Sequence, residues 1–262
     1  MPFFSALENA LTKNTLRLII GIVAVTALTG CAYWWRAYQT YQQMSEFDKY
    51  FSVASGSEFS LNFKQPVMLS EDFVSLARLR PTEENPKPDE KHWRYWFRKV
   101  DGYKKVIKPE INFYSDLNFN KQDKLDKWTF SSLFLDIAPP KFLEASIRSI
   151  GGGEINKGKM QLRGNTDAIQ KIAAQLPLKP AVVARLGPPF EVKKDKENEI
   201  YIYRFMLDTK SIDEGYEDRA LSEVKLSFNK KSQELVRMAG RFAGLKISIN
   251  YKKFQDNQSE ES

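Results

Sequence analysis

Residues 93–97 read Trp-Arg-Tyr-Trp-Phe and residues 201–205 read Tyr-Ile-Tyr-Arg-Phe, and these two stretches decide the fold. Successive side chains of a β-strand point to opposite faces of the sheet, so every second residue lies on the same face. Each stretch therefore predicts a strand with one aromatic face that packs on helices. The residues of these faces are Trp93, Tyr95 and Phe97 in the first strand and Tyr201, Tyr203 and Phe205 in the second.

The sequence around the two stretches repeats. Arg78-Leu79-Arg80-Pro81 precedes the first, and Arg185-Leu186-Gly187-Pro188 precedes the second. Both follow segments with helical character, and their prolines prevent the helices from continuing. A strand end with a polar turn comes after each aromatic stretch, at residues 117–121 and 226–230. The copies are 107 residues apart at the first feature (186 − 79) and 109 apart at the second (228 − 119).

This repeat predicts an α+β fold of two tandem similar units, each with short helices packed on a small antiparallel β-sheet. The first unit is expected over residues 58–150 and the second over residues 151–253. Gly151-Gly152-Gly153 marks the boundary, because glycine permits the backbone angles of a hinge or turn.

Helices are expected in both units. Ser70, followed by two acidic residues, is a helix start signal. Further helices are expected over residues 141–150 and 166–174. Residues 254–262 are polar and acidic, which predicts a disordered tail.

The N-terminus has the features of an export signal, which would also provide an N-terminal signal or anchor helix. Lys13 and Arg17 precede an apolar run over residues 18–27, and the run ends in Leu28-Thr29-Gly30-Cys31. This ending resembles the lipobox of bacterial lipoproteins, in which an aliphatic residue, a small residue and Gly precede Cys.

The lipobox resemblance implies that residues 1–30 are a cleaved signal peptide, with Leu28, Thr29 and Gly30 as recognition residues. It also implies that the thiol of Cys31 carries a diacylglycerol and that the new amino group is acylated. By the family's sorting rule, Ala32 after the cysteine implies the outer membrane. The remaining chain would then face the periplasm.

An uncleaved membrane anchor is the alternative. No charge lies between Arg17 and Arg36, and a span of roughly 18 uncharged residues is near the lower limit for crossing a bilayer. Tyr33, Trp34 and Trp35 would then form an interfacial aromatic belt. The chain would be a single-pass inner-membrane protein with a periplasmic domain.

Residues 31–57 are expected to form a membrane-proximal tether. Trp34, Tyr38 and Tyr41 recur at helical spacing, which predicts a short amphipathic helix. Its aromatic residues suit either the lipid headgroup region or packing on the folded body. Residues 52–57 are small and polar and are expected to be a linker.

Composition limits the class of protein. Removal of residues 1–30 leaves 232 residues (262 − 30), enough to bury a core without cross-links, and Cys31 is the single cysteine. The net charge is +7, or +6 without residues 1–30 (7 − 1), and both signs are spread along the chain. This pattern predicts a mixed surface whose positive excess suits anionic membrane lipid. Nucleic acid is not an expected partner, because no recognition motif is present.

The sequence has no catalytic signature, so no catalytic residue is assigned. His92 is the single histidine and has no Ser or Cys nucleophile pattern to serve. A zinc site needs three or four suitable ligands, so neither a metal nor a cofactor is expected. Trp96 lies between Arg94 and Arg98 on the strand face opposite the other aromatic residues, which predicts a contact with a partner.

The order of helix, Leu-Gly-x-Pro, polar loop and aromatic strand over residues 181–205 resembles the BamE (SmpA/OmlA) type of outer-membrane lipoprotein. In that family a helix-loop-helix packs on a small antiparallel sheet, and the β-lactamase inhibitor protein has a tandem version. The resemblance implies a binding module that scaffolds an envelope protein complex.

We therefore expect a lipid-anchored periplasmic protein that docks an unidentified envelope protein and is not an enzyme. Two further hypotheses remain open from the sequence. One is an envelope enzyme acting on peptidoglycan or lipid. The other is an inhibitor or ligand-binding protein that uses an aromatic sheet face.

Overall fold

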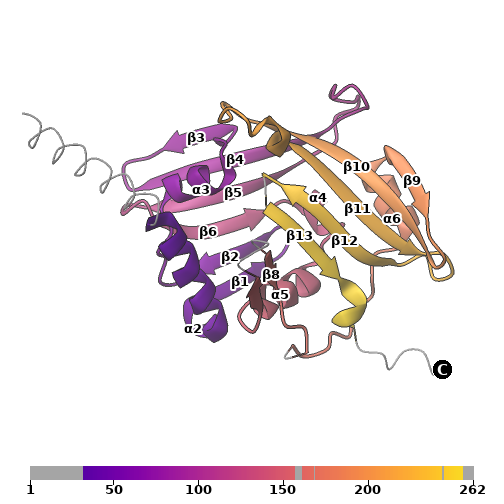
Figure 1. Ribbon diagram of the computed structural model, residues 1–262, viewed down its shortest axis with the longest axis horizontal. Coiled ribbons are helices and arrows are strands. Elements are labelled where there is room, and N and C mark those ends of the chain that lie inside the picture. Colours follow the sequence, from indigo (N-terminus) through magenta and orange to yellow (C-terminus); the bar gives the residue numbers. More distant parts are fainter. Residues whose placement is uncertain (1–31, 157–160, 168, 244, 256–262) are drawn as a thin grey trace, which may run out of the picture.

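The computed structural model describes residues 32–156, 161–167, 169–243 and 245–255. Its main feature is an antiparallel sheet of eleven strands in the order β1-β2-β6-β5-β4-β10-β11-β12-β13, with β3 paired to β4 and β9 paired to β10 (Figure 1). The strands are β1 (Phe51–Ser55), β2 (Phe59–Phe63), β3 (Glu83–Pro86), β4 (Glu90–Lys99), β5 (Asn112–Asn120), β6 (Leu125–Phe130), β9 (Glu191–Lys194), β10 (Asn198–Asp208), β11 (Leu221–Asn229), β12 (Leu235–Phe242) and β13 (Leu245–Asn250). A small separate hairpin consists of β7 (Glu154–Asn156) and β8 (Gln161–Arg163).

The helices of the described residues are short. The first covers residues 32–43 and leads into the segment with η1 and α2. The others are η1 (Met44–Glu46), α2 (Phe47–Tyr50), α3 (Ser70–Ala77), α4 (Ser132–Leu135), α5 (Pro140–Ser149), α6 (Lys179–Leu186), η3 (Glu217–Ala220) and η4 (Tyr251–Lys253). None of the helices in the described ranges is long and apolar enough to cross a membrane.

The two aromatic stretches lie in β4 and β10, and these strands pair with each other in the middle of the sheet. Phe97 lies opposite Leu207, and Lys99 lies opposite Phe205. Strands β5, β6, β2 and β1 extend the sheet from β4, whereas β11, β12 and β13 extend it from β10. The pairing of β4 with β10 therefore joins both parts of the chain into one sheet.

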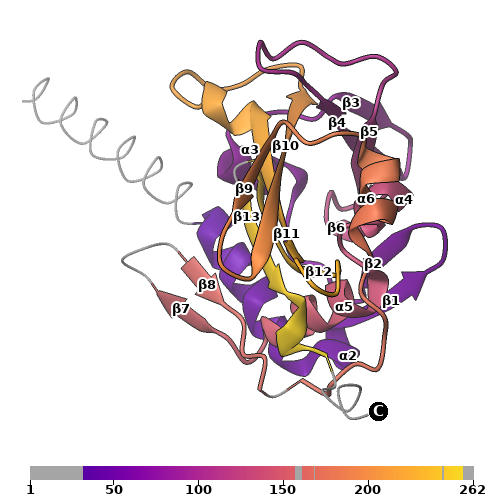
Figure 2. The ribbon, with the colours of Figure 1, turned by 90° about the vertical axis from the view of Figure 1, so that its right-hand side faces the viewer.

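The sheet curls strongly into a half-barrel, with β10 to β13 forming one wall and β4, β5, β6 and β2 the other (Figure 2). Aromatic rings from both walls meet in the interior. The ring of Phe242 in β12 lies 5.8 Å from those of Phe97 and Phe113, and 5.7 Å from that of Phe134 in α4. All four side chains are buried, so α4 and the two walls share one core.

Local signals explain where the helices begin and end. The predicted helix start at Ser70 is confirmed, and the carboxylate of Asp72 accepts a hydrogen bond from the Leu69 N–H at 2.8 Å. Such a bond satisfies a backbone donor that has no partner within the helix. Helix α6 has Pro180 in its first turn and ends at Gly187, whose φ is +66°. The helix expected over residues 141–150 is confirmed as α5.

The predicted fold class, two tandem α+β units with a small sheet each, is wrong. A helix, a short strand and three longer strands do follow one another twice, as α3-β3-β4-β5-β6 and as α6-β9-β10-β11-β12. However, β4 pairs with β10, and Phe242 of the later series packs on rings of the earlier one. A repeat in sequence carries no information on whether the two copies pair with each other, and for this reason the prediction failed.

Smaller differences concern the segments around the sheet. Residues 51–55, expected to be tether and linker, form β1 and pair with β2. The described residues of the expected helix over 166–174 are not helical. The predicted disordered tail is wrong for its first two residues, because Phe254 is buried and Gln255 pairs with Ile172. Residues 1–31, with the predicted signal peptide and lipobox, and residues 256–262 of the tail lie outside the described residues.

Candidate docking surface

The three predicted contact residues, Arg94, Trp96 and Arg98, lie on the face of β4 that points away from the core. They alternate with Trp93, Tyr95 and Phe97, which are buried. The rings of α3 and α4 pack on the core face, as shown by contacts of Phe73 with Phe119 and of Phe134 with Phe113. The predicted contact residues therefore belong to the outer, convex face of the half-barrel.

Strand pairing brings further side chains to this place. Tyr114 lies opposite Trp96 and Asp116 opposite Arg94 in the β4–β5 ladder, and Glu83 of β3 lies opposite Arg94 on its other side. Directly opposed residues of antiparallel strands share a face of the sheet. We use the name Trp96 patch for the resulting cluster of Glu58, Glu83, His92, Arg94, Trp96, Tyr114 and Asp116.

Asp116 is the electrostatic centre of the Trp96 patch. Its carboxylate accepts two hydrogen bonds from the Arg94 guanidinium, at 2.7 and 2.6 Å, and its Oδ2 lies 3.1 Å from His92 Nε2. Asp116 is only 7% exposed, so this bidentate pair is largely shielded from solvent. The hydrogen bonds from Arg94 to Asp116 raise the pKa of the guanidinium, and they fix its plane.

The rings of the Trp96 patch are also fixed by internal partners. Trp96 Nε1 donates a hydrogen bond to Glu83 at 2.8 Å, and the Tyr114 hydroxyl donates one to Glu58. The Arg94 guanidinium lies 4.0 Å from the Tyr114 ring centroid and 5.3 Å from that of Trp96. Burial, followed by the bond to Glu58, raises the pKa of Tyr114 to about 12, so the phenol remains neutral. Trp96 is half-buried and held in one orientation.

Arg98, the third residue predicted to contact a partner, lies between two carboxylates. Its guanidinium pairs with Glu110 at 2.9 Å and with Asp208 at 3.2 Å. Asp208 lies opposite Trp96 in the β4–β10 ladder. The ion pairs of Arg98 with Glu110 and Asp208 therefore form the edge of the Trp96 patch, next to the pairing of β4 with β10. Of the two flanking cations, Arg94 is the one placed over the Trp96 ring.

The Trp96 patch contains residue types that are common in binding surfaces. Trp, Tyr and Arg are the residue types that contribute most to protein–protein affinity. Here their rings and guanidinium plane are held in place before any partner binds, which reduces the entropy lost on association. The charged groups of the Trp96 patch already have partners within the protein.

The aromatic faces that suggested ligand stacking lie in the core. Trp93 and Phe97 are 1% and 3% exposed, and Tyr203 and Phe205 are fully buried. Their rings pack on other rings of the protein, for example Phe97 on Phe113 at 4.8 Å and Phe205 on Phe113 at 5.0 Å. These faces therefore serve packing, as the alternating pattern favoured.

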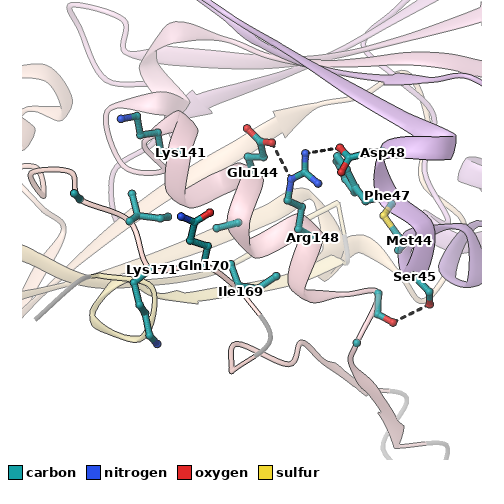
Figure 3. A pocket seen from close by; sticks show the side chains of 15 residues that line it. Met44, Ser45, Phe47, Asp48, Lys141, Glu144, Arg148, Ile169, Gln170 and Lys171 are labelled. Carbon is teal, nitrogen blue, oxygen red and sulfur yellow. Dashed lines mark hydrogen bonds and ion pairs between the residues drawn. The ribbon is translucent and has the colours of Figure 1, made fainter.

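An open hollow of about 930 Å³ lies between α2, α5 and residues 169–173 (Figure 3). Arg148 of α5 crosses it and forms ion pairs with Asp48 at 2.8 Å and with Glu144 at 2.9 Å. The same guanidinium lies 4.1 Å from the centroid of the Phe47 ring. Arg148 thus fastens α2 to α5 across the hollow.

Over the described ranges, no group of three or more His, Cys, Asp or Glu side chains is placed to hold a metal ion. The predicted lipidation residue Cys31 and its neighbours Leu28, Thr29 and Gly30 lie outside those ranges. Comparisons with family models, curated proteins and solved structures give no match for this chain.

Strand alternation correctly placed Arg94 and Trp96 on the outer face, but no sequence signal indicated that Tyr114, Asp116, Glu83 and Glu58 lie beside them. Tyr114 and Asp116 belong to β5, and their position depends on the register of the β4–β5 hairpin. An alternating pattern defines the face of a strand and not its register against a neighbour. Glu58 lies 56 residues from Tyr114 in the chain, which leaves no local signal for their contact.

Proposed function

We propose that this chain is a lipid-anchored envelope protein that acts as a non-catalytic docking module, with the Trp96 patch as its contact surface for another envelope protein. The observation that carries the proposal is the pre-organised set of Trp96, Tyr114 and Arg94 on the convex face of β4 and β5. The anchoring part of the proposal is supported by the export signal and the Leu28-Thr29-Gly30-Cys31 sequence.

Site-specific photo-crosslinking in cells tests the docking surface. A photoreactive residue replaces Asp208, which lies opposite Trp96 and has a 48% exposed side chain. The matched control position is Lys225 on the outer face of β11, with a 52% exposed side chain. We expect a discrete protein adduct from position 208 and not from position 225.

A second substitution links the adduct to the Trp96 patch. Trp96→Ala is expected to abolish the adduct at position 208 while the circular dichroism spectrum of the purified variant stays that of the wild type. An adduct that survives Trp96→Ala, or one formed equally at position 225, would contradict the proposed surface. If the spectrum changes, Trp96→Phe, which keeps an apolar ring and loses the hydrogen bond to Glu83, takes its place.

Metabolic labelling with a fatty acid tests the anchor separately. We expect the wild-type chain to incorporate label and Cys31→Ser to lose it. Equal incorporation by both chains would refute lipidation at Cys31 and favour the spanning segment as the means of attachment.

A further inference from the structure

The helix of residues 32–43 exposes its most aromatic side. The side chains of Trp34, Trp35 and Tyr38 are 47%, 59% and 43% exposed. At about 100° per residue, these three positions fall within an arc of roughly 100° on one side of the helix. The Trp35 and Tyr38 rings lie 6.1 Å apart, so the exposed rings are neighbours. Gln42, the other exposed residue on this side, is uncharged.

Two side chains outside the exposed arc fasten the helix to the folded body. Arg36 donates two hydrogen bonds to the carboxylate of Asp72 in α3, at 2.7 and 2.5 Å, and that carboxylate is 3% exposed. Nearer the end of the helix, the half-buried Tyr41 lies at the edge of the aromatic side, about 20° from Trp34 around the helix axis. Its hydroxyl donates a hydrogen bond to the Gly153 carbonyl at 2.9 Å. The helix is therefore held at two distant parts of the chain, and its aromatic side points away from the body.

In an ordinary surface helix the aromatic and apolar residues face the core, whereas these three rings face away from the body. Neighbouring exposed aromatic rings mark a surface that another phase or molecule covers. Trp and Tyr have apolar rings with a polar group at one end, and they gather at the boundary between lipid headgroups and acyl chains. An uncharged side made of these residues fits a bilayer interface.

The position of the helix in the chain brings it to a membrane. Trp34 is three residues from Cys31, and three residues span at most about 11 Å. Both attachments considered for this chain, a lipid on Cys31 or an apolar segment before it, place residue 31 at the bilayer surface. The aromatic side therefore lies within reach of the headgroups whichever attachment holds.

We propose that Trp34, Trp35 and Tyr38 lie in the interfacial region of a lipid bilayer, and that the fastened helix thereby sets the orientation of the half-barrel relative to the membrane. The inference rests on the proposed membrane attachment for bringing the helix to the bilayer. It does not depend on a protein partner or on the Trp96 patch.

Quenching of tryptophan fluorescence by brominated lipid tests this contact. The full chain is reconstituted into vesicles of phosphatidylcholine and phosphatidylglycerol whose acyl chains carry bromine near the carbonyl end. The chain has five tryptophans, and Trp93, Trp96 and Trp128 lie in the sheet. We expect the brominated lipid to quench only the emission of Trp34 and Trp35, so the quenched fraction should not exceed the share of these two tryptophans in the total emission.

Two double variants assign the quenched fraction. Trp34→Phe with Trp35→Phe keeps an apolar side and is expected to abolish the quenching. Trp96→Phe with Trp128→Phe is the matched control and is expected to retain it. Quenching that persists in the first pair, or that is absent from the wild type, overturns the proposal. The fatty-acid label on Cys31 tests the anchor, and the crosslinked adduct at position 208 tests the docking surface. Neither measurement depends on tryptophan quenching, so failure of the proposed function can be told apart from failure of this inference.

Discussion

Lys99 is a buried cation held by backbone carbonyls. It is 4% exposed, and its ammonium donates hydrogen bonds to the carbonyls of Leu186 and Pro188, both at 2.6 Å. These carbonyls lie at the C-terminal end of α6, where the helix dipole favours a positive charge. The ammonium also lies 5.1 Å from the Tyr203 ring centroid. Lys99 thus connects the middle of the sheet to the end of α6.

Burial lowers the pKa of Lys99 from 10.5 to about 8, which predicts a pH-dependent stability. Between these values the unfolded chain binds more protons at Lys99 than the folded chain, so the free energy of unfolding rises with pH in this range. We expect the melting temperature of the wild type, relative to that of Lys99→Met, to rise from pH 7.5 to pH 9.5. Burial raises the pKa of the adjacent Tyr203, which stays neutral over this range. A difference that does not change with pH would contradict the prediction.

Asp116 is expected to be the most sensitive residue of the Trp96 patch. Asp116→Asn keeps the shape of the side chain but removes the charge that holds Arg94, and we expect a loss of about 2 kcal/mol in the free energy of unfolding. The control is Asp208→Asn, whose carboxylate is 48% exposed and whose pair with Arg98 is expected to contribute at most about 1 kcal/mol. Urea denaturation measures both values. Equal losses would show that burial does not strengthen the Arg94–Asp116 pair.

At the scale of elements, the end of α6 depends on a glycine. Gly187 has a φ of +66°, and a Cβ at this position would lie 3.2 Å from Ile111 Cδ1 and 3.3 Å from Lys99 Nζ. Both the strained backbone and the close contacts oppose a side chain, so Gly187→Ala is expected to lower the free energy of unfolding by about 2 kcal/mol. Gly56→Ala is the control, since a Cβ there meets no atom within 4 Å, and its effect should stay within about 0.5 kcal/mol. Thermal unfolding compares the two variants, and equal melting temperatures would refute the argument.

Local sequence patterns predicted some of the helices and strands but not how the strands pair. Period-two alternation predicted the aromatic strands at 93–97 and 201–205 with the correct buried face, because alternation is a local property of a strand. The start of α3 at Ser70 and the position of α5 followed from local helix signals. The pairing of β4 with β10 was not readable, because its hydrogen bonds join residues more than a hundred positions apart. The same limit hid the members of the Trp96 patch outside β4.

At the scale of the whole molecule, one core connects residues that the repeat assigned to separate units. Phe205 of β10 contacts Phe113 of β5, and Phe242 of β12 contacts Phe97 of β4. The β4–β10 ladder adds backbone hydrogen bonds between the same two parts. We therefore expect loss of packing in the later strands to weaken the earlier ones and the molecule to unfold in a single cooperative transition.

The distribution of tryptophans allows a direct test of this cooperativity. Trp34 and Trp35 lie in the helix of residues 32–43, and Trp93, Trp96 and Trp128 lie in β4 and β6, so tryptophan fluorescence reports only on the part of the chain before β9. Leu226 in β11 is fully buried, and Leu226→Ala is expected to lower the free energy of unfolding by roughly 3 kcal/mol. Because the core is shared, the fluorescence transition in urea should shift as far as the transition followed by far-UV circular dichroism.

Lys225→Ala is the matched control for Leu226→Ala, because the neighbouring side chain points to the outer face and is 52% exposed. It should shift neither transition by more than about 0.5 kcal/mol. If the two parts unfolded independently, the fluorescence transition of Leu226→Ala would keep the urea midpoint of the wild type. Circular dichroism would then show a second transition at a lower urea concentration. Coincident shifts require that the loss of packing in β11 destabilise the surroundings of Trp93 in β4. The described contacts that connect the two are the β4–β10 ladder and the aromatic rings shared by the two walls of the half-barrel.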